Sequence, residues 1–178
     1  MEKSNKNFPE NKKLIEEIII NNLFVLGEHS NYNYGIMIVN ARYYSKDLDE
    51  EKIFNNLIKI FKQSLEISEK IYNKNQIIVI ANMQKMTFSN INSSFLKKMV
   101  NILQDTYPER LFRCFIKNPP FIFNYIYKII RPFMDNRTTS KIKILSKNKK
   151  IFDKEIKDIN VIPEINVHVK EKNDNLYL

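Results

Sequence analysis

The hydrophobic positions of this chain change their spacing from segment to segment, and this spacing predicts alternating helices and strands. Apolar residues that recur every three or four positions indicate amphipathic helices. The segments with this spacing are 12–26, 47–71 and 93–105. Unbroken or alternating apolar runs are typical of strands instead. These runs are 36–39, 77–81, 111–117 and 141–145.

One segment fits neither pattern, because it is apolar almost all round. It follows Pro119 and Pro120, which suit the first turn of a helix. Its apolar residues are Phe121, Ile122, Phe123, Tyr125, Ile126, Tyr127, Ile129, Ile130 and Phe133. A helix that spans a bilayer needs about 20 such residues, so this one is too short. It must be buried, cover an apolar cavity, or touch a membrane in the interfacial plane.

Strands and helices alternate along the chain, and this order predicts an α/β fold with a largely parallel sheet flanked by helices. The length of 178 residues suits one domain, which we place at 12–169. The polar start, 1–11, is expected to be disordered, and the charged tail, 170–178, to be frayed.

Composition excludes several classes of protein. With only two glycines, Gly27 and Gly35, the chain has no glycine-rich phosphate loop and no G-x-S-x-G elbow. The single cysteine, Cys114, excludes an internal disulfide and reads as a core thiol in a strand. No metal-ligand spacing, catalytic group of residues, signal peptide or membrane-spanning segment is evident. We therefore expect an intracellular protein without enzymatic activity, metal or cofactor.

Four motifs then follow one another between Gln76 and Leu145. They are LQDTYPERL at 103–111, NPPFIF at 118–123, RPFM at 131–134 and DNRTTSKI at 135–142. In this order and at these spacings they resemble L-Q-x-x-Y-P-E-R-L, N-A-P-x-x-F, K-P-F-L and D-x-x-T-x-x-K-I. These are motifs of the CRAL-TRIO lipid-binding domain, the fold of phosphatidylinositol- and tocopherol-transfer proteins.

The resemblance implies a lipid pocket floored by the sheet and covered by a mobile gate helix at 121–133. The expected gate and pocket residues are Phe121, Ile122, Phe123, Tyr125, Ile126, Ile129, Ile130 and Phe133. Enclosure matters, because a sixteen-carbon chain in water costs about 12 kcal/mol, at roughly 0.8 kcal/mol per methylene. The alternative is that this helix simply packs on the sheet as core. The implied function is to bind one hydrophobic ligand, a phospholipid such as phosphatidylinositol, and to exchange it at membranes.

The resemblance also implies a headgroup site. Glu109, Thr138 and Lys141 match positions that contact the inositol phosphate in phosphatidylinositol-binding members, and Thr87 is a further candidate hydroxyl. Lys141 would supply charge to the phosphate, and Glu109 would accept hydrogen bonds from ring hydroxyls. The alternative is a structural salt bridge or solvated charges at strand ends.

Departures from the family pattern leave a second function open. The chain has no counterpart of the family's basic amino-terminal helical lobe, and Asn82–Thr87 departs from the usual D-x-x-G-x-S turn. A reduced domain of this kind could instead be a scaffold that binds small GTPases or other proteins, or it could self-associate.

The net charge of +9 would favour anionic lipid, and charge alone would also suit nucleic acid. We expect a cytoplasmic protein in peripheral contact with anionic membranes, with no nucleic-acid partner.

Overall fold

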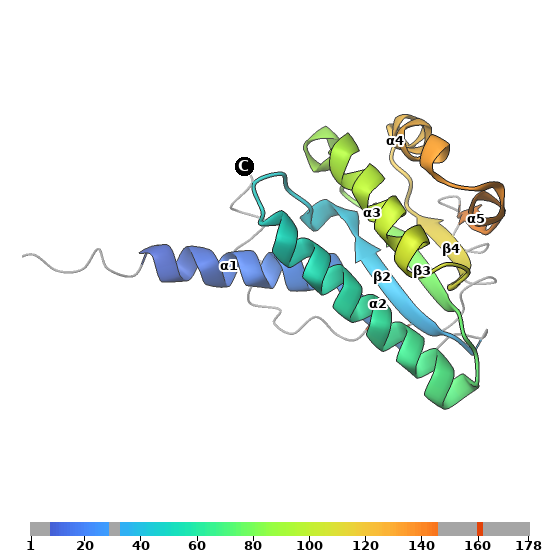
Figure 1. The fold of residues 1–178 in the computed structure, drawn as a ribbon. Coiled ribbons are helices and arrows are strands. Elements are labelled where there is room, and N and C mark those ends of the chain that lie inside the picture. Colours follow the sequence, from blue (N-terminus) through green and yellow to red (C-terminus); the bar gives the residue numbers. More distant parts are fainter. Residues whose placement is uncertain (1–7, 29–32, 146–159, 162–178) are drawn as a thin grey trace, which may run out of the picture.

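The computed structural model describes residues 8–28, 33–145 and 160–161 (Figure 1). Its α-helices are α1 (Phe8–Leu23), α2 (Glu50–Tyr72), α3 (Ser93–Thr106), α4 (Phe123–Ile130) and α5 (Asn136–Ser140). Its strands are β1 (Phe24–Glu28), β2 (Gly35–Asn40), β3 (Ile77–Asn82), β4 (Leu111–Lys117), β5 (Ile142–Ile144) and β6 (Asn160–Val161). Short 3-10 helices are η1 (Ala41–Tyr43), η2 (Phe88–Asn90) and η3 (Arg131–Phe133).

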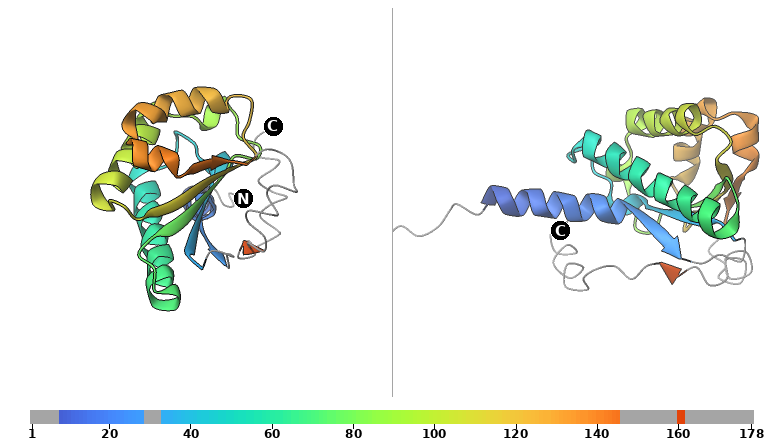
Figure 2. Two further views of the ribbon diagram at one scale, coloured as in Figure 1. Left: turned by 90° about the vertical axis from the view of Figure 1, so that its right-hand side faces the viewer. Right: turned by 60° about the horizontal axis from the view of Figure 1, so that its bottom comes forward.

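The strands form one largely parallel sheet, as predicted. Its order is β5-β4-β3-β2-β1-β6. Strands β2 to β5 are parallel, and β1 is antiparallel to both of its neighbours. Because the four parallel strands follow one another in sequence order, right-handed crossovers place all connecting helices on one side. Figures 1 and 2 show α2, α3, α4 and α5 covering the same face of the sheet.

The two long crossover helices have clear end signals. The carboxylate of Asp49 accepts hydrogen bonds from the backbone N–H groups of Glu51 and Lys52 and so caps α2. Asn73 ends α2 in the left-handed conformation, with φ of 51°. The cap of α3 is Asn92, whose side chain accepts from the N–H of Phe95.

The core lies on both faces of the sheet. On the helix-covered face, Met37 and Ile77 pack with residues of α2 and α3. On the opposite face, Ile36, Ile78 and Phe115 are at most 1% exposed. Ile77 and Ile78 of β3 are both fully buried, one on each face, which is typical of the unbroken apolar run of a central parallel strand.

Helix α2 approaches β2 very closely at Gly35. The N–H of Gly35 donates to the hydroxyl of Ser68 at 2.7 Å, and the hydroxyl of Ser64 donates to the carbonyl of Ile36 at 3.0 Å. Both serines are fully buried. A Cβ atom at Gly35 would lie 1.8 Å from the carbonyl oxygen of Ser64, so only glycine fits here.

Several boundaries differ from the prediction. The helix expected over 12–26 ends at Leu23, because Phe24, Val25 and Leu26 pair with β2 as the antiparallel strand β1. Helix α1 begins at Phe8, so residues 8–11, expected to be disordered, are helical. Residues 1–7, the end of the predicted domain and the tail at 170–178 lie outside the described residues. The single helix expected over 121–133 is divided into a turn, α4 and η3.

Candidate functional site

The inner side of α4 packs on the sheet. Ile122, Phe123 and Ile126 are 4%, 7% and 2% exposed. They form a cluster with Met83 and Met86, which follow β3, and with Ile116 of β4. The helix thus lies against the carboxyl ends of two central strands, in the arrangement that a closed gate and a simple core helix would share.

The outer side of the same segment is aromatic and exposed. Phe121 is 90% exposed and Tyr125 54%, and they lie beside Phe88 of η2, which is 59% exposed. The ring of Phe88 is 6.0 Å from that of Phe121 and 6.5 Å from that of Tyr125, centroid to centroid. We call these three residues the aromatic cluster. The remaining gate candidates, Ile129, Ile130 and Phe133, are half-buried.

Helix α4 is held differently at its two ends. After it, the side chain of Gln104 on α3 donates to the carbonyl of Phe133 at 2.7 Å, which ties η3 to α3. Before it, Asn118 adopts a left-handed conformation with φ of 52°, and two prolines follow. Its side chain donates to Asn82 at 3.3 Å, a weak hydrogen bond. The amino-terminal end of α4 is therefore the end with the weaker polar attachment among these contacts.

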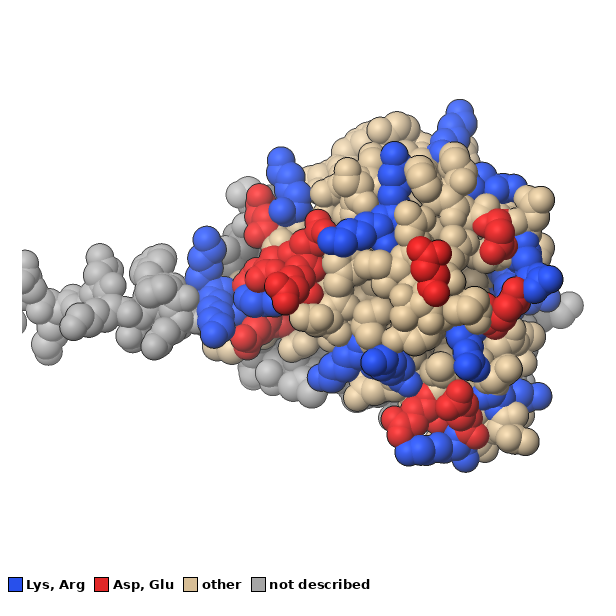
Figure 3. Space-filling model, viewed as in Figure 1, with Lys and Arg blue, Asp and Glu red and all other residues tan. Residues whose placement is uncertain are grey.

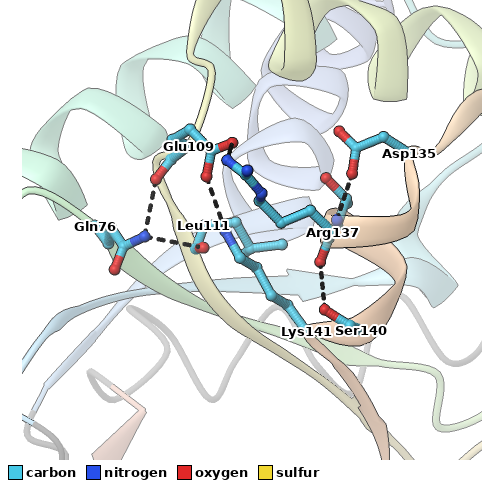
Figure 4. Close-up of polar contacts among 8 residues, drawn as sticks. Gln76, Glu109, Leu111, Asp135, Arg137, Ser140 and Lys141 are labelled. Carbon is cyan, nitrogen blue, oxygen red and sulfur yellow. Dashed lines mark hydrogen bonds and ion pairs between the residues drawn. The ribbon is translucent and has the colours of Figure 1, made fainter.

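A second group of predicted residues meets at the amino end of β4. Glu109 has a left-handed backbone, with φ of 60°, and its carbonyl accepts from the side chain of Gln76 at 2.9 Å. Its carboxylate forms an ion pair with Arg137, and the ammonium of Lys141 lies 3.6 Å from its second oxygen (Figure 4). We call Glu109, Arg137 and Lys141 the Glu109 cluster.

Helix α5 positions the two cations of this cluster. Asp135 caps it by accepting a hydrogen bond from the N–H of Thr138 at 2.5 Å, and this bond lowers the pKa of Asp135 below its usual range. The hydroxyl of Ser140 donates to the carbonyl of Arg137 at 2.7 Å. Arg137 and Lys141 are four residues apart, so they project from the same side of this turn.

The structure brings together only part of the predicted headgroup site. Glu109 and Lys141 are in contact, and Thr138 lies one turn before Lys141, where its backbone N–H donates to the capping carboxylate of Asp135. Thr87 lies beyond the carboxyl end of β3, where its hydroxyl contacts Ser89 and Asn90. Because the amino and carboxyl ends of parallel strands lie at opposite edges, the length of β4, roughly 20 Å, separates Thr87 from Glu109.

Two residues of these clusters were missed by sequence reasoning. Arg137 falls at a variable position of D-x-x-T-x-x-K-I, and its spacing of four residues from Lys141 was the available signal. Phe88 follows Thr87 in a loop, and nothing local indicates that its ring stays exposed beside Phe121.

Cys114 is not part of either site. It packs beside the cluster under α4, and burial raises the pKa of its thiol to about 12. We expect native protein at pH 8 to react with a thiol reagent such as dithionitrobenzoate on the order of a thousandfold more slowly than unfolded protein. Labelling in the presence and absence of guanidinium chloride checks this, and rapid labelling of the native state would contradict it.

Charge is not concentrated on the helix-bearing face. Figure 3 shows Lys and Arg interspersed with Asp and Glu there. In the described part of the chain, no helix has the length and hydropathy of a membrane span. Among these same residues, no three His, Cys, Asp or Glu side chains are grouped as metal ligands.

Comparison with known proteins places this arrangement in a family. The profile of the CRAL/TRIO domain matches residues 21–164, and the chain therefore belongs to the CRAL/TRIO domain family. The solved structure "Crystal structure of Sfh5" has the same fold, with a TM-score of 0.65, 19% identity, and coverage of 77% of this chain and 53% of that one.

Two curated relatives show the extent of the sequence match. The SEC14 cytosolic factor of Eremothecium gossypii is 36% identical over 77 residues, which are 43% of this chain and 23% of the relative. The phosphatidylinositol transfer protein SFH5 of Kluyveromyces lactis is 23% identical over 124 residues, 67% of this chain and 41% of the relative. The chain thus matches less than half the length of either relative.

Proposed function

We propose that this protein binds a single phospholipid, such as phosphatidylinositol, and exchanges it at membranes. The observation that carries the proposal is the contact between Glu109 and Lys141, which lie 32 residues apart in sequence and come from two separate family motifs. The Lys141 side chain is 18% exposed, so its charge is partly shielded from water, where it attracts a phosphate more strongly. The name of the Kluyveromyces lactis relative, phosphatidylinositol transfer protein SFH5, supports the same class of ligand.

In this proposal, α4 moves away from the sheet to open a ligand pocket. Opening would uncover Ile122, Phe123 and Ile126, at about 2 kcal/mol for each side chain in water. A membrane removes much of this penalty by taking up the exposed surface. The methionines that face α4, Met83 and Met86, are flexible side chains that can repack around a lipid chain. In this proposal the protein is cytoplasmic and touches anionic membranes peripherally, through the aromatic cluster.

Native mass spectrometry of the purified protein tests the proposal directly. A stoichiometric lipid adduct, lost on organic extraction, is the expected result. A ligand-free protein that takes up no lipid from vesicles would sink the carrier function and favour the protein-interaction alternative.

Replacing Lys141 by Ala should weaken loading of phosphatidylinositol about tenfold, because the phosphate loses its partly buried cation. Loading from phosphatidylinositol-containing vesicles measures the effect. Lys62→Ala, which removes an exposed lysine from α2, is the matched control and should load as wild type. Equal loading by the Lys141 variant and the control would show that the headgroup assignment is wrong.

A further inference from the structure

One cation of the Glu109 cluster comes from outside the family motif. Arg137 stands at a variable position of D-x-x-T-x-x-K-I, yet it pairs with the same carboxylate as Lys141. Each oxygen of Glu109 faces a different cation, as Figure 4 shows. Two positive groups therefore share one negative group, and the cluster has a net charge of about +1 at neutral pH.

We propose that Arg137 and Lys141 together form a two-cation site for a phosphate group, in which Glu109 is the counter-ion while the site is empty. This inference rests on the proposed lipid-binding function and extends it to a residue that selects anionic headgroups. On binding, the phosphate takes the place of the carboxylate between the two cations. The Glu109 carboxylate is then available to accept hydrogen bonds from hydroxyl groups of the headgroup.

The two cations differ in exposure, and this difference indicates from which side each of them would contact the phosphate. The side chain of Lys141 is 18% exposed and that of Arg137 is 69% exposed. Lys141 therefore meets the phosphate from the protein side, and Arg137 from the solvent side. The guanidinium has five N–H donors in a planar fork, so pairing with Glu109 leaves donors for phosphate oxygens.

Hydrogen bonds on both sides of Arg137 hold its backbone in place. The Asp135 cap fixes the start of α5, and Ser140 holds the carbonyl of Arg137 from the other side. Glu109 is held in turn through its own carbonyl, which accepts from Gln76 on the adjacent segment. Only the side chains of Arg137 and Glu109 have to reorient, and this lowers the entropic cost of binding a phosphate.

The test compares Arg137→Ala with Arg137→Lys and with Lys70→Ala. Lys70 is a matched control, since it is an exposed cation that pairs with Glu66 on α2, away from the cluster. Each variant is loaded from phosphatidylcholine vesicles with and without phosphatidylinositol, and bound lipids are quantified by mass spectrometry. We expect Arg137→Ala to reduce phosphatidylinositol loading about fivefold, with the Lys variant intermediate. Phosphatidylcholine loading should be unchanged, because its choline cation offsets the charge of its own phosphate and is repelled by a site with two cations. A purely structural role would lower loading of both lipids together.

Other outcomes distinguish a failure of the two-cation site from a failure of the proposed lipid-binding function. If Arg137→Ala loads phosphatidylinositol as wild type while Lys141→Ala does not, the two-cation site is wrong and the lipid function stands. If wild-type protein loads neither lipid, the proposed function fails. Titration with soluble glycerophosphoinositol distinguishes the source of the phosphate. If glycerophosphoinositol binds in an Arg137-dependent manner but no lipid is taken up from vesicles, the two-cation site is supported and a lipid is excluded as its ligand.

Discussion

Replacing Gly35 by Ala is expected to prevent folding. The added methyl group would lie 1.8 Å from the backbone oxygen of Ser64, far inside van der Waals contact. Neither backbone segment can shift without a large loss of packing. Ser64 lies in the middle of α2, and Gly35 is the first residue of β2, which is buried in the core. Separating α2 from β2 would also break the hydrogen bond from Gly35 to Ser68. We expect a loss above about 4 kcal/mol, a large part of the stability of a domain of this size.

Circular dichroism and urea unfolding measure this loss, and Gly27→Ala is its control. A methyl group at Gly27 would meet the side chain of Ile36 at 2.9 Å rather than backbone. Overpacking of this kind costs about 1–3 kcal/mol, so the control should fold with a lower unfolding midpoint. A Gly35 variant that unfolds at the wild-type urea concentration would show that the helix and strand are not this close.

Removing the exposed rings of Phe121 and Tyr125 together should slow lipid transfer between vesicles about thirtyfold. If these rings enter the membrane interface, each contributes roughly 1 kcal/mol to the opening step. Since both side chains are exposed, the double Ala variant should keep the stability of the wild type. Transfer of a fluorescent phospholipid between donor and acceptor vesicles measures the rate.

The choice of position decides whether this experiment is informative. Ile126 is 2% exposed, so a charge placed there would unfold the region under α4 and stop transfer for a trivial reason. Asn124→Ala is a better control, because Asn124 is exposed on the same helix and carries no ring. Wild-type transfer by the Phe121 and Tyr125 double variant would exclude the aromatic cluster as the membrane contact.

The predictable part of the fold was encoded locally. Strand β4 begins and ends where its apolar run predicts, and α2 follows from its helical spacing and the Asp49 cap. Strand β1 was missed because the apolar residues of α1 continue into it without a turn residue, and only pairing with β2 separates the two elements. Helix α5 was missed because five polar residues have no periodicity to detect.

The candidate site was predictable only as far as family motifs reach. Glu109 and Lys141 became candidates for one headgroup site through such a resemblance, and their ion pair was only the alternative. No local pattern places the loop before β4 beside the turn before β5. Thr87 was included because its hydroxyl could reach a headgroup, but it follows β3 and therefore lies at the opposite end of the strands from Glu109. Exposure of Phe88 and the ion pair of Arg137 depend on tertiary packing, which spacing alone does not reveal.

The common direction of β3, β4 and β5 imposes a polarity on any molecule that reaches both ends of this fold. The Glu109 cluster lies at the amino ends of the strands, whereas the exposed rings of Phe88 and Phe121 lie at their carboxyl ends. A phospholipid bridging the two would lie lengthwise, with its acyl tails toward the rings. This phospholipid would then leave the protein with its acyl tails first and its polar headgroup last.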